Sequence, residues 1–240
     1  MEEVDTHHVE LEVAPFLSLT ARADLRAIAV QYFLGLTGSE TGRRYIVDNG
    51  DYLQQLINIV DDEQAAIAKD AFLAIVNLAA ESDIACRIIK LPTAEKLLDR
   101  LLKAALHEGG VEPNIACMAL SNLSRSESAA TVIAEYVVKE TYVGVKRIVD
   151  VLCRPDLLGR DYLAPFLSNL TQVSSIREIL LDHDRVVFQR ILPLINYMKS
   201  ATRRGGIVGT VRNCCFETGI NTLHVYMELK KSFAFVLSCK

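Results

Sequence analysis

Apolar residues recur along this chain at helical spacing, with short breaks that contain glycine, proline or charged residues. The segment 63–80 has apolar positions at i, i+4, i+7 and i+11, which predicts a helix with one buried face. Those positions are Ile67, Ala71, Ala74 and Leu78. Further helices are expected at 84–90, 94–107 and 112–125. Breaks are expected at Leu91-Pro92, Gly109-Gly110, Thr141, Arg154-Pro155, Asp182-His183-Asp184 and Gly205-Gly206.

The helical pattern is also periodic over a longer distance. The segments 71–78, 116–123, 163–170 and 206–213 share one apolar pattern that ends in or next to an asparagine. The intervals between Asn77, Asn122, Asn169 and Asn213 are 45, 47 and 44 residues. A degenerate fifth copy at 30–38 has Thr37 where the others have asparagine, 40 residues before Asn77. This period is typical of armadillo or HEAT repeats, and three helices per period favour armadillo.

The sequence therefore predicts an all-α, armadillo-like, right-handed superhelical solenoid of about five three-helix repeats, with the first and last imperfect. The repeat domain is expected to span 1–218, and 219–240 is expected to form a divergent C-terminal tail. In that tail, 233–237 is apolar at successive positions. Both a tail that folds over the last repeat and an aggregation-prone end are consistent with this pattern.

The recurring asparagine is the main candidate for function. Asparagine is unfavourable inside a helix by about 0.5–0.7 kcal/mol relative to alanine, so its return at one register needs a cause. Its side chain can accept from a backbone N–H and donate to a C=O, which suits an extended peptide in a concave groove. Four such hydrogen bonds at about 1 kcal/mol each give about three decades of affinity. Alternatively, each asparagine bonds the end of a neighbouring helix and fixes repeat geometry; both interpretations stay open.

Other side chains near this register extend the predicted protein-binding groove. Asp70 precedes Asn77 by two turns, and Arg212 is adjacent to Asn213. The remaining candidates are Met118, Arg125, Tyr162 and Gln172. Arg203, Arg204 and Arg212 form a basic patch that could contact an acidic segment, although a solvated edge is the commoner explanation of such a cluster.

Composition excludes several classes of function. The 240 residues include 26 Lys and Arg against 30 Asp and Glu, so the net charge of −4 gives no basic field for nucleic acid. The start of the chain lacks a secretory signal, and every apolar run is too short to span a bilayer, so we expect a cytoplasmic chain. None of the six cysteines forms a C-x-x-C pair, and we expect buried, reduced thiols.

Neither a cofactor nor a metal is expected. Asp182-His183-Asp184 and the Asp5–His8 segment do not repeat at a ligand spacing. A HEAT-repeat di-iron hydroxylase would need several His-Glu pairs, but the chain has only His107-Glu108. The glycine clusters lack the Lys-Ser/Thr of a phosphate-binding loop. We therefore expect a protein that is not an enzyme.

The segments 33–44, 70–79 and 204–218 resemble one particular armadillo family. Their most specific string is Gly209-Thr-Val-Arg-Asn-Cys-Cys-Phe216, and the resemblance covers about 24–218. It is to the protein HGH-one homologue family, also called the brain-protein-sixteen type. This resemblance implies a cytosolic folding factor that binds new translation elongation factor two and passes it to the cytosolic chaperonin. Beyond Thr218 the match ends, and the sequence resembles an alternative or truncated ending.

Two other functions are known for armadillo proteins. A general scaffold that joins folded partners through its outer surface is the second interpretation. A nuclear-import receptor is disfavoured because its groove stacks tryptophan against lysine stems four residues before each asparagine. Those positions here are Leu73, Met118, Pro165 and Gly209, and the chain has no tryptophan.

Overall fold

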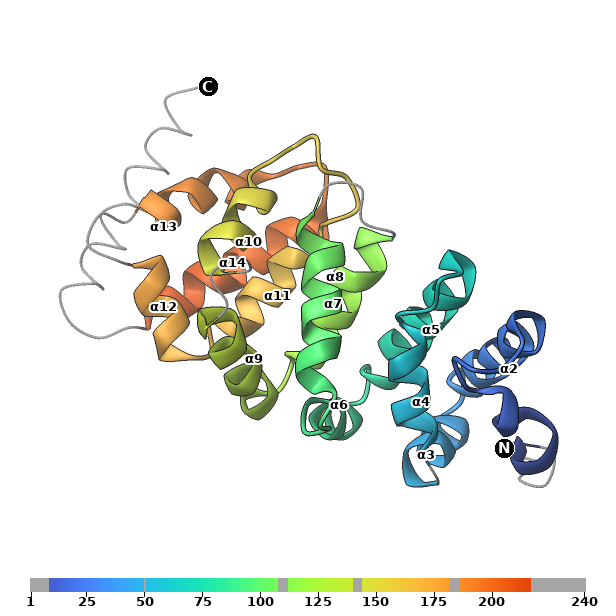
Figure 1. The fold of residues 1–240 in the computed structure, drawn as a ribbon. Coiled ribbons are helices and arrows are strands. Elements are labelled where there is room, and N and C mark those ends of the chain that lie inside the picture. Colours follow the sequence, from blue (N-terminus) through green and yellow to red (C-terminus); the bar gives the residue numbers. More distant parts are fainter. Residues whose placement is uncertain (1–8, 50, 108–111, 140–143, 182–185, 217–240) are drawn as a thin grey trace. The chain divides into compact units, whose positions relative to one another are not determined.

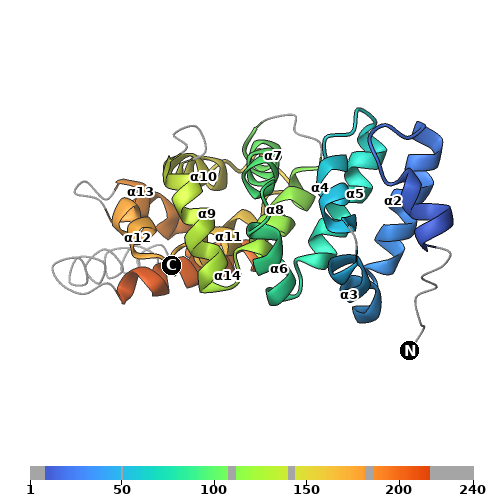
Figure 2. The ribbon, with the colours of Figure 1, turned by 60° about the horizontal axis from the view of Figure 1, so that its bottom comes forward.

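The computed structural model describes residues 9–49, 51–107, 112–139, 144–181 and 186–216. These residues are helical or irregular, with no strand among them. The chain forms two compact units, residues 1–101 (unit 1) and 102–240 (unit 2). Figures 1 and 2 show the helices of each unit.

Unit 1 begins with a π-helical turn (Val9–Val13) and a 3-10 turn (Ala14–Phe16). Its α-helices are α2 (Ala23–Leu36), α3 (Glu40–Asp48), α4 (Tyr52–Ile59), α5 (Ala65–Leu78) and α6 (Ser82–Ile89). The next helix, α7 (Ala94–Leu106), begins in unit 1 and ends in unit 2. Within unit 1, α5 packs against α2 and α4, and α3 packs against α2 and α4.

Unit 2 continues the same succession of helices. It contains α8 (Pro113–Leu123), α9 (Glu127–Lys139), α10 (Val145–Leu152), α11 (Leu163–Leu170), α12 (Ser174–Leu180), α13 (Val186–Ile191), a 3-10 turn (Leu192–Asn196) and α14 (Ala201–Cys215). Helix α11 packs between α8 and α14, and α10 contacts α11, α12 and α13. The helices therefore recur in threes along the chain, with α2, α5, α8, α11 and α14 as the third helices.

Each unit has its own apolar core. Phe33, Ile46 and Ile75 are fully buried in unit 1, and Phe166 and Phe188 are fully buried in unit 2. Burial of such side chains contributes about 1.5–3 kcal/mol each. Serine hydroxyls define where two helices begin, because Ser39 Oγ accepts from Gly42 N (3.0 Å) and Ser200 Oγ accepts from Arg203 N (3.1 Å).

Most expected helices agree with the structure, but one expected break is wrong. Leu91-Pro92 and Arg154-Pro155 lie between helices as predicted. Gly205-Gly206, in contrast, lies inside α14, which continues to Cys215. The reason is contact: a Cβ on Gly206 would lie 2.2 Å from the carbonyl carbon of Ala164 in α11, so glycine is needed for close helix packing. The expected breaks at Gly109-Gly110, Thr141 and 182–184, and the tail 219–240, lie outside the described residues.

Candidate protein-binding face

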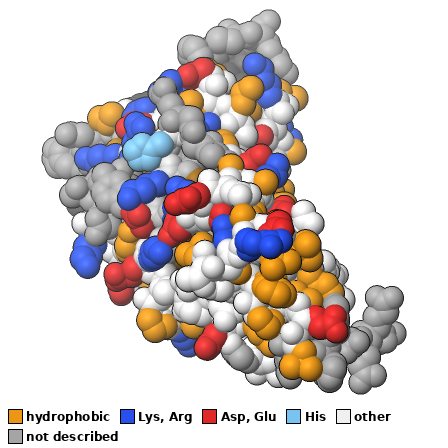
Figure 3. Space-filling view, turned by 45° about the vertical axis from the view of Figure 1, so that its right-hand side comes forward, with side chains coloured by type: hydrophobic (Ala, Val, Ile, Leu, Met, Phe, Trp, Pro, Cys, Tyr) orange, Lys and Arg blue, Asp and Glu red, His pale blue; other side chains and the backbone are white. Residues whose placement is uncertain are grey.

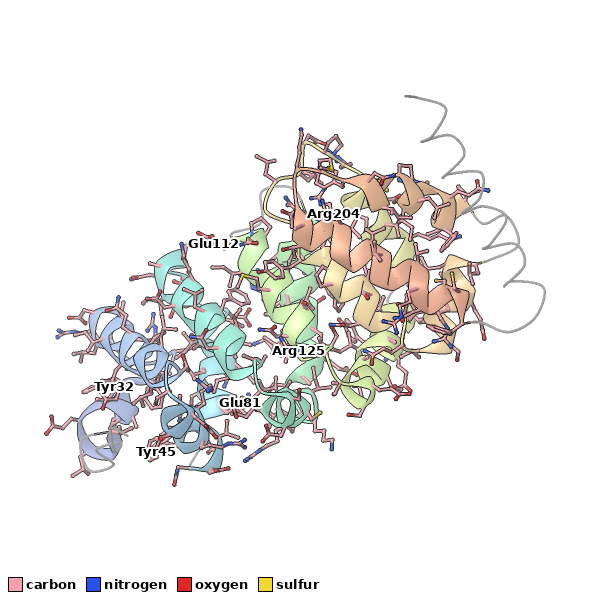
Figure 4. The ribbon with its side chains drawn as sticks, turned by 180° about the vertical axis from the view of Figure 1, so that it is seen from behind. Tyr32, Tyr45, Glu81, Glu112, Arg125 and Arg204 are labelled. Carbon is pink, nitrogen blue, oxygen red and sulfur yellow. The ribbon has the colours of Figure 1, made fainter. Side chains whose placement is uncertain are left out.

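The third helices carry the recurring asparagines. In unit 1, Asn77 lies on α5, and in unit 2 Asn122, Asn169 and Asn213 lie on α8, α11 and α14. All four side chains are partly exposed. We call the outward side of α8, α11 and α14 the third-helix face of unit 2. Figure 4 looks onto these helices and labels Glu112, Arg125 and Arg204 on them or at their ends.

Three of the asparagines bond the preceding third helix of the same unit. Asn77 Nδ2 donates to Thr37 Oγ1 at 2.8 Å. Asn169 Nδ2 donates to Ser121 O at 2.9 Å and to Ser124 Oγ at 3.2 Å. Asn213 Nδ2 donates to Ser168 O at 3.1 Å and to Thr171 Oγ1 at 3.0 Å. We call each of these contacts between an amide and a hydroxyl an amide–hydroxyl clasp.

The hydroxyl in each clasp belongs to the residue that ends a third helix. Thr37 ends α2, Ser124 ends α8 and Thr171 ends α11. Each hydroxyl donates in turn to a carbonyl of its own helix: Thr37 to Leu34 O (2.6 Å), Ser124 to Leu120 O (2.8 Å) and Thr171 to Ser168 O (2.6 Å). The hydroxyl therefore links the last turn of one helix to the next repeat.

This geometry corrects the alignment of the degenerate first repeat. Thr37 does not stand in place of an asparagine. It occupies the position of Ser124 and Thr171 at the helix end, where α5 has Ala79. The residue two positions earlier, at the register of Asn77, is Gly35. The prediction that Thr37 replaces an asparagine is therefore wrong, because Thr37 is the hydrogen-bond partner of Asn77.

Arginines add a second link at two of these helix ends. Arg43 Nη1 donates to Thr37 O at 2.9 Å, and Arg177 Nη1 donates to Thr171 O at 2.9 Å. Arg177 Nη1 also reaches Gln172 O at 2.8 Å. Both arginines follow their threonine by six residues, so they satisfy orphan carbonyls at the end of a helix. The sequence analysis missed these residues, although the shared spacing was a visible signal.

The clasps settle which atoms of two asparagines are engaged. A carbonyl oxygen can only accept, so Asn169 and Asn213 must direct their amide nitrogen toward the preceding helix. Neither Oδ1 accepts a hydrogen bond from a described residue, and neither is among the buried atoms that lack a partner. Each Oδ1 is therefore a solvent-accessible acceptor. The structural role of the asparagines is observed, while their binding to another chain stays a prediction.

The other predicted groove residues have varied surroundings. Arg125 is exposed and its Nη2 donates to Asn122 Oδ1 at 2.8 Å. Gln172 Nε2 donates to Asn169 O at 2.9 Å, which places it at the end of α11. Asn114 Nδ2 lies 3.7 Å from the Met118 sulfur on the outer side of α8.

Three more predicted residues lie at separate places. Asp70 is partly buried on α5 in unit 1, two turns before Asn77. In unit 2, Tyr162 is partly buried and immediately precedes α11. Arg212 is exposed on α14, with its guanidinium carbon 5.9 Å from the centre of the Phe216 ring. Asp70 therefore belongs to a different unit from Tyr162 and Arg212.

The predicted basic patch is smaller than expected. Arg203 is buried; its Nε donates to Asp161 Oδ1 at 2.8 Å, and its guanidinium lies 4.9 Å from the Tyr197 ring centre. Arg203 therefore stabilises the fold and does not add accessible charge. Arg204 is partly exposed and donates to Tyr197 O at 3.1 Å. Arg204 and Arg212 remain as the accessible cations of α14.

Charge on the rest of the surface is mixed. Acidic and basic side chains lie together on the face drawn in Figure 3. In unit 1, Arg44 pairs with Glu81 at 3.0 Å and Arg87 pairs with Asp48 at 2.6 Å. The third helices of unit 2 differ, because α8, α11 and α14 contain no acidic residue and three arginines.

The cysteines and possible metal ligands of the described residues do not form a reactive thiol centre or a metal site. Cys117 and Cys214 are buried, whereas Cys86, Cys153 and Cys215 are partly exposed. Burial raises the pKa of the Cys117 thiol to about 12. The described part of the chain has no group of three His, Cys, Asp or Glu side chains that could hold a metal ion. Cys239, Glu108 and the segments 5–8 and 182–184 lie outside it.

None of the described helices is long and apolar enough to cross a membrane.

Solved structures with a similar fold are armadillo repeat proteins. The designed armadillo repeat protein YIII(Dq)4CqI has a TM-score of 0.72 at 14% identity, over 92% of this chain and 90% of that one. A related designed protein, in complex with the peptide (KR)4, has a TM-score of 0.71 at 15% identity, over 93% and 89%. The predicted fold class, an all-α armadillo-like solenoid, is confirmed.

Sequence relatives define the family. The model of a domain of unknown function, DUF383, matches residues 104–229. "Protein HGH1 homolog" of Homo sapiens is 42% identical over 212 residues, which cover 86% of this chain and 53% of that protein. The Danio rerio protein of the same name is 39% identical over 209 residues, 86% of this chain and 54% of that protein. This chain spans about half the length of these relatives. With its DUF383 match and these relatives, the chain belongs to the HGH1 homologue family.

Proposed function

We propose that this chain is a non-enzymatic folding factor that binds newly made translation elongation factor two and assists its folding with the cytosolic chaperonin. The observation that carries the proposal is membership of the HGH1 homologue family. The resemblance of the sequence to this family implies the client and a cytoplasmic location. The proposed contact surface is the third-helix face of unit 2.

The chemistry of that face supports a temporary hold on a polypeptide. Asn169 and Asn213 each present an accessible carbonyl acceptor, and an extended segment has backbone N–H groups to donate. Two such hydrogen bonds at about 1 kcal/mol each provide about 2 kcal/mol, roughly a thirtyfold gain in affinity. A folding factor must release its client, so this modest and sequence-tolerant contribution suits the role.

Capture of the client during synthesis tests the proposal. Elongation factor two is translated in a cell-free system that contains the tagged chain, and co-captured client is measured during synthesis and again after folding. The expected result is capture of the new polypeptide and little capture of the folded protein. The proposal is wrong if new elongation factor two is captured no better than an unrelated new protein of similar size.

A blocking variant tests the surface. Gly205 is exposed on α14, and a Cβ added there meets nothing within 4 Å, so Gly205→Trp adds bulk to the third-helix face without a clash at its first atom. Val132→Trp on α9, where Val132 is 42% exposed, is the matched control. Client capture should fall for Gly205→Trp alone, and neither variant should have a lowered melting temperature. Equal capture by both variants would favour a general scaffold that uses another surface.

A further inference from the structure

The charge of the three helices that form the third-helix face of unit 2 is one-sided. Helices α8, α11 and α14 contain no Asp or Glu, and their charged residues are Arg203, Arg204 and Arg212. Glu112 precedes the first residue of α8, at the opposite end of that helix from Arg125. Arg203 is buried and paired with Asp161. Arg212 is exposed on α14, and Arg125, which follows α8 and donates to Asn122 Oδ1, is exposed as well. This local excess of positive charge exists on a chain whose net charge is −4.

The corresponding helix of unit 1 is different. Helix α5 carries Lys69 next to Asp70, so positive and negative charge offset one another there. Helix α2 carries Asp24, which is exposed, and Arg26, which is buried and pairs with Asp62. Among the third helices of the described residues, an excess of accessible cations therefore occurs in unit 2 and not in unit 1.

The hydrogen-bonding groups of this face are also one-sided. Asn169 and Asn213 use their N–H groups in the clasps, and each offers only Oδ1 to a ligand. A ligand must therefore bring donors, and an extended backbone brings N–H groups at regular intervals. Helices in contact lie about 8–10 Å apart, and an extended chain advances about 3.3 Å per residue. Successive acceptors thus match backbone N–H groups two or three residues apart.

The spacing of these acceptors is held firmly by the packing of α14 on α11. A Cβ on Gly206 would lie 2.3 Å from Pro165 N, and one on Gly209 would lie 2.3 Å from Ser168 Oγ. Helices in such contact cannot approach further, and the clasp between Asn213 and Thr171 prevents them from sliding. The face is therefore pre-organised for one ligand geometry, which lowers the entropic cost of binding.

We propose that the third-helix face of unit 2 binds an extended, acidic polypeptide segment, whose backbone N–H groups bond Asn169 and Asn213 and whose carboxylates lie near Arg125 and Arg212. This inference rests on the proposed function, because the proposed function also uses this face to bind a polypeptide. It adds that the bound segment is acidic. Positive charge makes the preference for acidic segments salt-dependent, because exposed charges are screened at high ionic strength.

Peptide binding to the full chain tests the inference. The probes are fluorescein-labelled peptides of about ten residues that alternate Glu with Ser or Lys with Ser, and the measurement is fluorescence anisotropy. The Glu-Ser peptide should bind at least about tenfold more tightly than the Lys-Ser peptide at low salt, and this difference should shrink at high salt. Equal binding of the two peptides, or no binding of either, overturns the inference.

Two further comparisons assign the contacts. The double variant Arg125→Glu with Arg212→Glu should lose the preference for the Glu-Ser peptide. The control is Lys90→Glu with Lys139→Glu, which changes the net charge equally, on exposed residues outside the third helices. The control should keep the preference. N-methylation of each serine in the Glu-Ser peptide removes alternate backbone donors and should weaken binding. If the control pair loses the preference equally, or N-methylation has no effect, the assigned contacts are wrong.

The client experiment separates this inference from the proposed function. If new elongation factor two is captured but the acidic peptide has no preference for the face, the inference fails alone. If the acidic peptide binds as expected and the client is not captured, the proposed function fails alone.

Discussion

The hydroxyl of Thr171 accepts a hydrogen bond from Asn213 Nδ2 at 3.0 Å and donates one to Ser168 O at 2.6 Å. Because Asn213 Nδ2 also reaches Ser168 O at 3.1 Å, three polar groups from two neighbouring repeats form a closed set. The same arrangement of amide, hydroxyl and carbonyl occurs at Asn169, Ser124 and Ser121. Asn169 and Asn213 therefore have a structural function that does not depend on a ligand.

Removal of the Thr171 hydroxyl should destabilise unit 2. Thr171→Val keeps the shape of this fully buried side chain but leaves one N–H of Asn213 without its acceptor. We expect a loss of about 1–3 kcal/mol in the free energy of unfolding, measured by urea denaturation. Thr171→Ser keeps the hydroxyl and should lose about 1 kcal/mol, for one methyl group.

Thr131 provides the control for this prediction. Its hydroxyl also donates to a carbonyl of its own helix, Glu127 O at 2.9 Å, but it is partly exposed. Thr131→Val should change the free energy of unfolding by less than about 0.5 kcal/mol. If Thr171→Val costs no more than Thr131→Val, the clasp does not stabilise the fold.

Asn213→Asp should make stability depend on pH. An ionised carboxylate has no N–H to donate and would face Ser168 O, so the pKa of this new carboxyl should be raised in the folded state. A raised folded pKa means that the folded protein binds the proton more tightly, so the variant regains stability as pH falls toward the unfolded value of about 3.9. The difference in unfolding free energy between the original chain and Asn213→Asp should therefore be largest near neutral pH.

Denaturation at several pH values between neutral and mildly acidic measures this difference. Asn114→Asp is the control, because Asn114 is exposed in the first turn of α8, where the helix dipole favours a carboxylate. Its difference from the original chain should therefore change with pH only slightly, and in the opposite direction. A constant penalty for Asn213→Asp across the range would show that Asn213 does not direct its amide nitrogen at the carbonyl.

Much of the fold could be predicted because armadillo repeats combine two periods that both appear in the sequence. The apolar stripe of Ile67, Ala71, Ala74 and Leu78 is buried as expected, and the interval between asparagines gave the length of the repeat. Both signals reflect helix geometry and repeat packing, and neither depends on the fine position of a side-chain atom.

The contacts of single polar residues were harder to predict. An amide can point toward a neighbouring helix or toward a ligand, and only the positions of Ser121 O and Ser168 O decide between them. Arg203 was expected to be accessible, although it shares a helix side with Ile207, Thr210 and Cys214, which are all buried. The glycines of α14 predicted a break that does not occur, because helix propensity is a weak preference that tertiary packing overrides.

Cysteine reactivity should follow burial in the folded chain. Burial raises the pKa of Cys117 to about 12, so its thiol stays protonated near pH 8 and cannot act as a nucleophile. Burial also raises the pKa of Cys153 and of Cys215, but both side chains are partly exposed. Timed alkylation followed by peptide mass spectrometry should show no modification of Cys117 before unfolding. Modification of Cys117 at the rate of Cys153 would show that the Cys117 thiol is not buried.

Adjacent glycines in α14 should respond to alanine in opposite directions. A Cβ at Gly205 meets no atom within 4 Å, so Gly205→Ala should raise the free energy of unfolding by about 0.5–1 kcal/mol through helix propensity alone. A Cβ at Gly206 would lie 2.2 Å from the carbonyl carbon of Ala164 and 2.3 Å from Pro165 N, which are backbone atoms that cannot rotate away. Gly206→Ala should therefore force α14 away from α11 and cost at least about 1–3 kcal/mol.

The pair forms its own control, because both variants add one methyl group to the same helix and have the same propensity gain. Thermal and urea unfolding of the two should separate the propensity term from the packing term. The opposite signs follow from the position of each glycine on the helix, since Gly206 faces α11 and Gly205 faces solvent. If Gly206→Ala were as stable as Gly205→Ala, α11 and α14 would not be in close contact, and the fixed spacing of the acceptors on Asn169 and Asn213 would lose its basis.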